Sequence, residues 1–471
     1  MNLLCKSAVE MAQGIHDGIF NARMLVSASL ERAEQVQSKL NAFTIIDHGG
    51  ALAAADRIDA ERAIGKALPA LAGVPIVIKD MTPTSGLPTT LGSCATKSGS
   101  EAEEDAIIVS RLRLSGAIIV AKSTTSELAY SGFTRSLRYG VTRNPWNVDR
   151  TTGGSSGGSA VAVAAGVVPF AEGSDMGGSI RIPAAACGIV GFKPSLGRIP
   201  MTILPTPIDT MSHFGPLAAR VSDAVAFVAA TSGPSDLDLL SQVTSFDVPA
   251  CKPTVLRDLH FGFSVDLGYC SVAQDVRESF MESLDRLRAN GARVTEVSLT
   301  WTRDVMDQWL VKWAALLSLF PATQQAESRA LMDPQLVSLL GSAEHQTAGD
   351  LKRTEILQSK MAADFADIMG RFDAFLCPTL AVTAPGVMAQ DVDYEVTLPN
   401  GSFQCFDMAH PFSMLATYPA ISLPIMSNSD DLPIGLQIVG PRYRDERLLS
   451  IAGAVEKCLG EARIVRHGWQ N

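Results

Sequence analysis

Apolar runs alternate with amphipathic stretches along this chain, a pattern typical of a sheet covered by helices. Residues 73–78 form a continuous apolar run bounded by turn residues, which predicts a strand buried on both faces, and Lys79 follows at its carboxyl end. A helix at 106–115 and a strand at 117–120 come next, and the same alternation returns at 261–297. Because sheets of this kind hold their chemistry at strand carboxyl ends, Lys79 is a candidate functional residue.

Helical periodicity flanks this pattern on both sides. We expect helices within residues 7–66 and again within 301–370, and short Pro-rich strands at 375–378, 420–424 and 434–439. The second helical region carries apolar side chains at three-to-four spacing, and such a stripe more often faces a core than a ligand, with a pocket wall as the alternative. Its members are Trp309, Trp313, Leu316 and Phe320.

Two serine-bearing glycine runs, at residues 153–159 and 175–181, are the most specific chemical signal. Between them we expect a small-residue helix and then a returning strand at 167–171. About eleven helical residues rise roughly 16 Å and about six extended residues return roughly 20 Å, so the two runs meet again. Ser179 is therefore predicted to lie level with Ser155, at the amide-rich N-terminal end of the helix.

A serine hydroxyl needs a base, and a lysine serves where burial leaves its amine neutral. Lowering the pKa of Lys79 from about 10.4 to about 7 requires roughly 4 to 5 kcal/mol of differential stabilisation. The apolar strand before Lys79 and the helix N-terminus near Ser155 both favour that shift. The backbone amides of Met176, Gly177 and Gly178 are candidate donors to an oxyanion.

Two charged residues belong to the second run. Asp175 is expected to fix the loop, and an ordinary turn cap is a comparable interpretation. Arg181 is expected in a structural ion pair, with a substrate carboxylate as the less favoured partner.

Three other motif interpretations compete. A Gly/Ser run alone is often a linker, but here a helix able to pack on a sheet follows it. Residues 153–157 also match the Gly-x-Ser-x-Gly elbow of α/β-hydrolases, which would make Ser155 the nucleophile of an esterase; the polar segment 143–150 disfavours this because an elbow follows a buried strand. A phosphate-binding loop is disfavoured because its usual Gly-Lys-Ser/Thr ending is missing.

Composition narrows the function classes. The 471 residues are 46% apolar, with mean hydropathy +0.17, net charge -10 and a pI near 5.3, which predicts a globular protein and disfavours nucleic acid or an anionic membrane as a partner. The sequence suggests neither a secretory leader nor a membrane span, so a cytoplasmic protein is expected. Eight cysteines and seven histidines show neither Cys-x-x-Cys nor His-Glu-x-x-His spacing, so we expect neither a disulfide framework nor a metal site.

Taken together, these segments resemble the amidase signature family. The matching segments are 73–80, 153–159, 175–181, 187–194 and 432–440, and the similarity spans most of the chain. The resemblance implies a single α/β/α amidase domain over 1–471 around a mixed central sheet covered by helices. Within it we expect a helical N-terminal flank at 1–68, a signature core with the catalytic residues at 69–240, and a more variable region at 250–390 that shapes the pocket.

The resemblance also implies a role for each candidate residue. Ser179 is expected to be the nucleophile, Lys79 the base, and Ser155 the serine that bridges them, preceded by a cis peptide bond from Gly154. Amide hydrolysis then runs through an acyl-enzyme, with no metal or cofactor.

The substrate follows less directly from the resemblance. Amidotransferase relatives usually carry glutamine after the motif arginine, where this chain has Ile182. Ile182 therefore favours a neutral, partly apolar amide, anilide or carbamate (urethane), with possible esterase activity. An amidotransferase component that works with a partner and a binding protein that does not use its serines stay as alternatives, and a homodimer is one of the assembly states left open.

Overall fold

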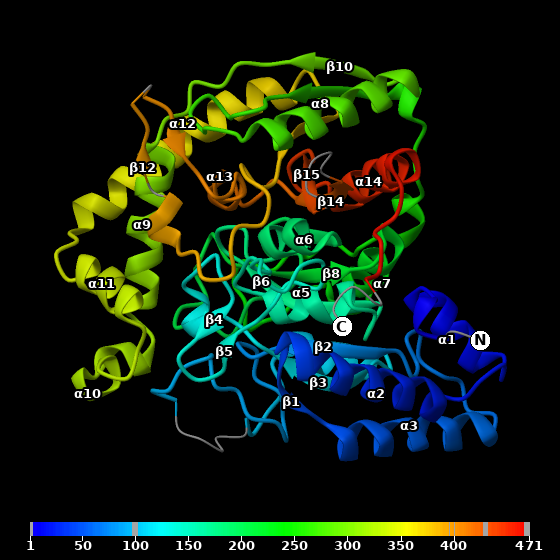
Figure 1. Ribbon diagram of the computed structural model, residues 1–471. Helices are drawn as coiled ribbons and strands as arrows, with labels where there is room; N and C mark the ends of the chain where they lie inside the picture. Colours follow the sequence, from blue (N-terminus) through cyan, green and yellow to red (C-terminus); the bar gives the residue numbers. More distant parts are fainter. Residues whose placement is uncertain (1–2, 97–101, 395, 400, 427–431, 466–471) are drawn as a thin grey trace.

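A single mixed sheet of eleven strands runs through the molecule, in the order β1-β3-β2-β6-β8-β7-β14-β15-β11-β9-β10 (Figure 1). The computed structural model describes residues 3–96, 102–394, 396–399, 401–426 and 432–465. The strands of this sheet are β1 (Phe43–Ile46), β2 (Pro75–Lys79), β3 (Ile118–Ser123), β6 (Phe170–Asp175), β7 (Val190–Lys193), β8 (His213–Ala218), β9 (His260–Phe263), β10 (Arg293–Glu296), β11 (Ala374–Pro378), β14 (Ala420–Met426) and β15 (Pro433–Val439). Two small hairpins lie outside it, formed by β4 (Arg135–Ser136) with β5 (Gly140–Val141), and β12 (Val396–Thr397) with β13 (Phe403–Gln404).

Helices cover both faces of this sheet. Helices α2, α5 and α6 follow one another on one face, and α4, α7, α14 and α8 on the other. The longer helices are α1 (Ala8–His16), α2 (Ala22–Leu40), α3 (His48–Ala63), α4 (Ile107–Leu114), α5 (Gly157–Ala164), α6 (Arg181–Cys187), α7 (Val221–Thr231), α8 (Gln274–Ala289), α9 (Asp304–Leu317), α11 (Pro334–Ala343), α12 (Ala348–Met369) and α14 (Asp445–Leu459), and the shorter ones are α10 (Ala326–Arg329) and α13 (His410–Met414). The predicted α/β/α domain with a mixed sheet is confirmed.

Strand directions explain why the functional residues meet at one edge. Strands β3, β2 and β6 are mutually parallel, so the carboxyl ends of β2 and β6 lie side by side. All five residues of β2 are buried, as its apolar sequence predicts. Lys79, the last residue of β2, therefore lies at the same edge as the loop that follows β6.

Two local predictions differ from the structure. The returning strand begins at Phe170 and not at Val167, because the amides of Gly166 and Val167 bond back to the last turn of α5. The N-terminal flank is not purely helical, since Phe43–Ile46 forms β1 and pairs antiparallel with β3. Four residues between two long helices gave too short a signal to detect.

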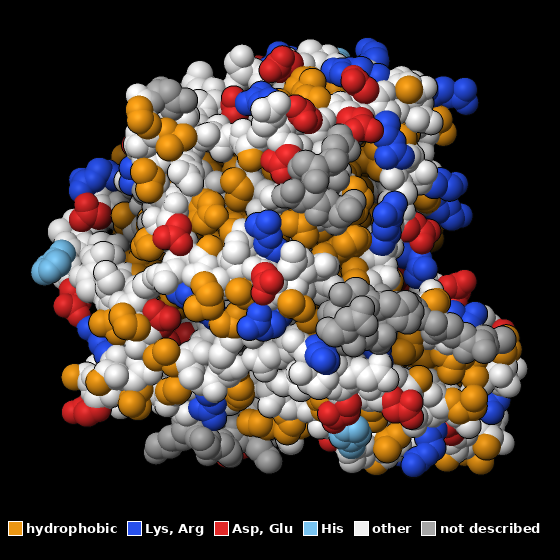
Figure 2. All heavy atoms as spheres, in the orientation of Figure 1, with side chains coloured by type: hydrophobic (Ala, Val, Ile, Leu, Met, Phe, Trp, Pro, Cys, Tyr) orange, Lys and Arg blue, Asp and Glu red, His pale blue; other side chains and the backbone are white. Residues whose placement is uncertain are grey.

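The hydrophobic core is divided between two main clusters. One fills the space between the sheet and its covering helices. The other lies among α9, α11, α12 and α13, and includes Met81 and Met176 beside the glycine runs. Figure 2 shows acidic and basic side chains interspersed over one face of the molecule, with hydrophobic side chains gathered near α13 and β14. Within the part of the chain described, no helix is long and apolar enough to cross a membrane.

The close packing of α5 gives a stability prediction. A Cβ atom at Gly158, in the first turn of α5, would lie 2.5 Å from the carbonyl oxygen of Ala42 and 2.6 Å from the backbone nitrogen of Thr124. Gly158→Ala is expected to cost about 1–3 kcal/mol of unfolding free energy, as overpacked cores do. Gly49 is the matched control, because it lies in the first turn of α3 with no atom within 4 Å of its Cβ position. Urea denaturation should show a loss for Gly158→Ala alone; equal stability of both variants would contradict the packing argument.

Candidate active site

Lys79 and Ser155 meet at the carboxyl edge of the sheet. Lys79 is completely buried, and its Nζ donates to Ser155 Oγ at 2.7 Å and to Ser174 Oγ at 2.9 Å. The backbone amide of Lys79 donates to Glu172 Oε2 at 2.8 Å, so the backbone of Lys79 is held in place together with its amine. The structure therefore brings these two predicted residues into direct contact.

Burial changes the protonation of this lysine. It lowers the pKa of Lys79 to about 7, because the charged form loses its hydration, while the carboxylates of Glu172 and Asp175 oppose the shift. Near neutral pH a substantial fraction of the amine is then uncharged and able to accept a proton. The sequence argument named burial correctly, but it did not include the two opposing carboxylates.

Sequence reasoning missed Glu172 and Ser174. Both lie on β6 at alternating positions, so their side chains share one face of the strand, the face that meets Lys79. Burial raises the pKa of Glu172, against the hydrogen bond from the Lys79 amide and the charge of Lys79. The period-two alternation of β6 is the signal that could have identified both residues.

The backbone around Ser155 is closely packed. The peptide bond between Gly154 and Ser155 is cis, as the family resemblance implies. A Cβ atom at Gly154 would lie 2.8 Å from the backbone nitrogen of Phe133, so only glycine fits there. The hydroxyl of Thr134 donates to the carbonyl oxygens of Gly153 and Ser155, at 2.8 and 3.3 Å. Residues 153–155 are therefore held by close packing against the Phe133 backbone and by the hydrogen bonds from Thr134.

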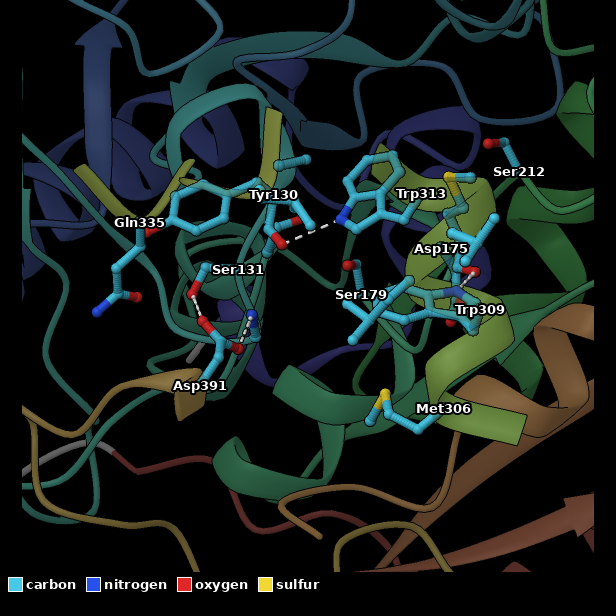
Figure 3. Close-up of a pocket in the computed structure, with 18 of the residues that line it drawn as sticks. Tyr130, Ser131, Asp175, Ser179, Ser212, Met306, Trp309, Trp313, Gln335 and Asp391 are labelled. Atoms are coloured by element: carbon cyan, nitrogen blue, oxygen red, sulfur yellow. Dashed lines mark hydrogen bonds between the residues drawn. The ribbon is translucent and has the colours of Figure 1, made fainter. Parts of the chain in front are cut away.

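Ser179 lies beside Ser155, as the matched lengths of helix and strand predict. The amide of Ser156 donates to the Ser179 carbonyl oxygen at 3.3 Å. Ser179 is partly exposed, and it borders the same cavity as Ser155 and Ser174 (Figure 3). In the described part of the chain the Ser179 hydroxyl makes no hydrogen bond to Ser155, so the two serines are neighbours that share a cavity without a direct contact.

Asp175 fixes the loop that carries Ser179. Its carboxylate accepts from the amides of Gly178 and Ile180, at 2.8 and 3.3 Å, and from two nitrogens of Arg181 at 2.9 and 2.8 Å. Burial alone would raise the pKa of Asp175, but the charge and hydrogen bonds of Arg181 outweigh it and hold the pKa well below its ordinary range. The two interpretations of Asp175, loop anchor and turn cap, describe the same contacts.

Arg181 has a structural role in this arrangement. It is completely buried and pairs with Asp175, and its remaining donors bind the carbonyl oxygen of Ala409, the hydroxyl of Ser413 and Oε1 of Gln437. It does not line the cavity, within the residues that the structure describes. The preferred interpretation of Arg181 as an ion-pair residue agrees with this geometry.

The predicted oxyanion donors are not equivalent. The amide of Gly178 is already bonded to Asp175, so it holds the loop. The amides of Met176, Gly177 and Ser179 donate to no acceptor among the described residues. Met176 and Gly177 are thus available to a ligand, as is the amide of Ser179 at the end of the same predicted stretch.

The cavity in front of the serines has a volume of about 700 Å³. The stripe serves both predicted roles: Trp313, Leu316 and Phe320 belong to the second core cluster and Trp309 packs against it, while Trp309, Trp313 and Phe320 also line the cavity. The pocket forms because α9 packs across the carboxyl edge of the sheet and not against its face. Ile182 also borders the cavity.

Both tryptophans tie α9 to the serine loops. The indole nitrogen of Trp309 donates to the Met176 carbonyl oxygen at 3.0 Å, and that of Trp313 to the Tyr130 carbonyl oxygen at 3.1 Å. The Trp309 ring packs on Gly177, where a Cβ atom would lie 2.8 Å from Cε2. Figure 3 shows Trp309 and Tyr130 on opposite sides of Ser179.

A histidine-based site is not supported by this geometry. Ser155 has Lys79 as its partner, and no histidine bonds to it in the described ranges. His213 contacts the carbonyl oxygens of Asp175 and Ala416, and burial together with the charge of Lys193 lowers its pKa to about 3. No cluster of three or more His, Cys, Asp or Glu side chains able to hold a metal occurs among the described residues.

Comparison with known proteins gives one family and several relatives. The family model described as Amidase matches residues 24–449. The acylamidase of Rhodococcus erythropolis is 33% identical over 461 residues, covering 97% of this chain and 96% of that protein. A component of the glutamyl-tRNA(Gln) amidotransferase of Prochlorococcus marinus is 31% identical, covering 95% and 96%. The structure of a bacterial aryl acylamidase of the amidase signature family matches with a TM-score of 0.89 at 26% identity, covering 96% of each chain.

The site geometry predicts how Ser179 reacts with a fluorophosphonate, a reagent that phosphonylates activated serines. Labelling should occur at Ser179 and accelerate as pH rises through about 7, because only neutral Lys79 can accept a proton. At pH 6 the rate should be roughly a tenth of that at pH 8, as expected for a group with this pKa. Peptide mass spectrometry locates the adduct. Labelling of Ser155 in the intact protein, or an unchanged rate in Lys79→Ala, would contradict this assignment.

Proposed function

Because the chain belongs to the amidase family, we propose that it hydrolyses the C–N bond of an amide by forming an acyl-enzyme on Ser179. The contact that carries the proposal is the 2.7 Å hydrogen bond between Lys79 Nζ and Ser155 Oγ, next to Ser179. A lysine whose pKa is near 7 is a suitable general base at neutral pH. Ser155 lies between this base and the cavity, where a proton relay needs a hydroxyl.

In this mechanism Ser179 Oγ attacks the amide carbonyl carbon, and its proton passes through the Ser155 hydroxyl to neutral Lys79. The free amides of Met176, Gly177 and Ser179 stabilise the oxyanion. The C–N bond then breaks as the proton returns through Ser155 to the leaving nitrogen. Water attacks the acyl ester by the same route, which releases the acid and restores Ser179. The amide and one water become one carboxylic acid and one amine.

The cavity favours an uncharged, partly apolar acyl group. Ile182 borders the space in front of Ser179, and Trp309 and Trp313 add aromatic surface. One relative is an acylamidase and one structural relative an aryl acylamidase. We therefore propose amides, anilides or aryl carbamates as substrates, with ester cleavage as a side activity.

A component of an amidotransferase is the second candidate function. Several relatives at about 30% identity are components of glutamyl-tRNA(Gln) amidotransferases, with nearly the same coverage. Ile182 in place of the expected glutamine argues against this function. The two candidates differ in activity, because the amidotransferase component requires a partner and the amidase does not.

A substrate panel tests the proposal. The purified protein alone should hydrolyse at least one of a primary aliphatic amide, an acyl-anilide, an aryl carbamate and a p-nitrophenyl ester. Ser179→Ala and Lys79→Ala should lower kcat for amides by about 10³-fold or more, since members of a catalytic set act as a unit. Product release by chromatography is the measurement. Full amide activity in Lys79→Ala would exclude the Ser–Lys mechanism, and inactivity of the protein on every substrate would exclude a stand-alone hydrolase.

Trp309 provides a separate test of the oxyanion loop. Trp309→Phe keeps an aromatic ring on Gly177 but removes the hydrogen bond to the Met176 carbonyl oxygen. A less well positioned loop should lower kcat by about tenfold, in the range of a lost hydrogen bond, with little change in KM. Trp313→Phe is the control, because it removes a bond to Tyr130 outside the loop. Equal losses of kcat in both variants would speak against a specific role for Trp309.

A further inference from the structure

The acidic side chains that border the cavity differ in whether they have a basic partner. No lysine or arginine lines this cavity, within the residues described. Among the same described residues, no basic side chain lies within ion-pair distance of the Asp391 carboxylate. Three of the other four cavity carboxylates pair with an arginine: Asp175 with Arg181, Asp307 with Arg303, and Asp350 with Arg353. The fourth, Asp407, lies 3.3 Å from Nδ1 of His410.

Asp391 lies close to the reacting centre. It begins the short 3₁₀ helix Asp391–Tyr394, and its Oδ2 accepts from Ser131 Oγ at 2.5 Å while Oδ1 accepts from the Gly132 amide at 2.9 Å. Ser131 and Gly132, the two residues that bond to Asp391, pack against the first serine run. A Cβ atom at Gly154 would lie 2.9 Å from the Ser131 carbonyl oxygen. Figure 3 shows Asp391 and Trp309 on opposite sides of Ser179.

The carboxylate of Asp391 retains unused capacity as an acceptor. Each of its oxygens accepts one hydrogen bond from another residue, and its own backbone amide adds a third, whereas an ionised carboxylate offers about four acceptor sites in all. Burial raises the pKa of Asp391, while the bonds from Ser131 and Gly132 oppose that rise; Arg135 also lowers it, without forming an ion pair. A cation in the cavity would find a partly desolvated partner here, and a second carboxylate would be repelled.

We propose that Asp391 recognises a positively charged nitrogen of the substrate, so that the preferred substrates are amides that carry an ammonium group apart from the scissile bond. This inference rests on the proposed amidase function of the same cavity. The uncharged acyl group remains next to the reacting serine, and the ammonium group binds the carboxylate of Asp391. Amides bearing a carboxylate are excluded by the same charge.

A purely structural role is the alternative for Asp391, because the same two hydrogen bonds hold Ser131 and Gly132 in place. The two roles differ in one observable. A structural anchor affects every ligand alike, whereas a recognition group discriminates ligands by charge. Ligands of similar shape and different charge therefore separate them.

Isothermal titration calorimetry at neutral pH provides this test, with benzylammonium, benzyl alcohol and benzoate as ligands that require no turnover. The intact protein should bind benzylammonium about tenfold more tightly than benzyl alcohol, as expected for one charge-assisted hydrogen bond, and benzoate most weakly. In Asp391→Asn the ratio between benzylammonium and benzyl alcohol should fall to about one. Asp307→Asn is the matched control: it removes one charge from the cavity wall, but Arg303 already compensates that charge, so the ratio should persist.

The outcomes separate this inference from the proposed function. If benzylammonium binds the intact protein no more tightly than benzyl alcohol, the inference is wrong whatever the stability of the variants. If Asp391→Asn weakens both ligands equally, Asp391 is a structural anchor and the inference is again overturned. Selective binding of benzylammonium that depends on Asp391, in a protein that hydrolyses no amide of the panel, would support the ligand class and refute the amidase function.

Discussion

The arrangement of this site depends on a lysine amine taken out of water at the end of a buried strand. A charged amine is costly there, so burial lowers the pKa of Lys79 to about 7, and two hydroxyl groups replace its lost hydration. Glu172 and Asp175 limit the shift, which keeps proton affinity in the useful range. Three features surround this one desolvated amine. The apolar strand β2 buries it, the alternation of β6 places Ser174 beside it, and the close glycine contacts of the first run hold Ser155 next to it.

A second buried charged group, the Asp175–Arg181 pair, holds the loop of Ser179 in place. Asp175 and Arg181 neutralise each other, and their remaining hydrogen-bonding groups are used on the loop amides, α13 and Gln437 of β15. Burying such a pair costs desolvation free energy. Removing one partner costs more free energy still, because the other would then be an uncompensated buried charge. It therefore ties the loop of Ser179 to distant parts of the sheet.

Sequence reasoning succeeded where local rules decide. The burial of β2, the return of the chain between the glycine runs and the meeting of Ser155 with Ser179 follow from periodicity and element length. It failed where tertiary contacts decide, at the short edge strand β1 and at the hydrogen bond that occupies the Gly178 amide. For Trp309 and Trp313 it named both the core and the cavity wall, but it did not foresee that these residues serve both. Asp391 gave no signal, because its neighbours Ser131 and Gly132 lie 260 and 259 positions away in sequence.

The site draws on two separate stretches of chain. Lys79, both serines and the loop amides come from residues 79–179, while the tryptophans and Asp391 come from residues 309–391. Much of the cavity wall is therefore encoded apart from Lys79 and the two serines. Substitutions in the later stretch at positions that do not contact the serine loops can reshape this wall while the Lys79–Ser155 contact is kept, so members of one family can come to accept different ligands over evolutionary time.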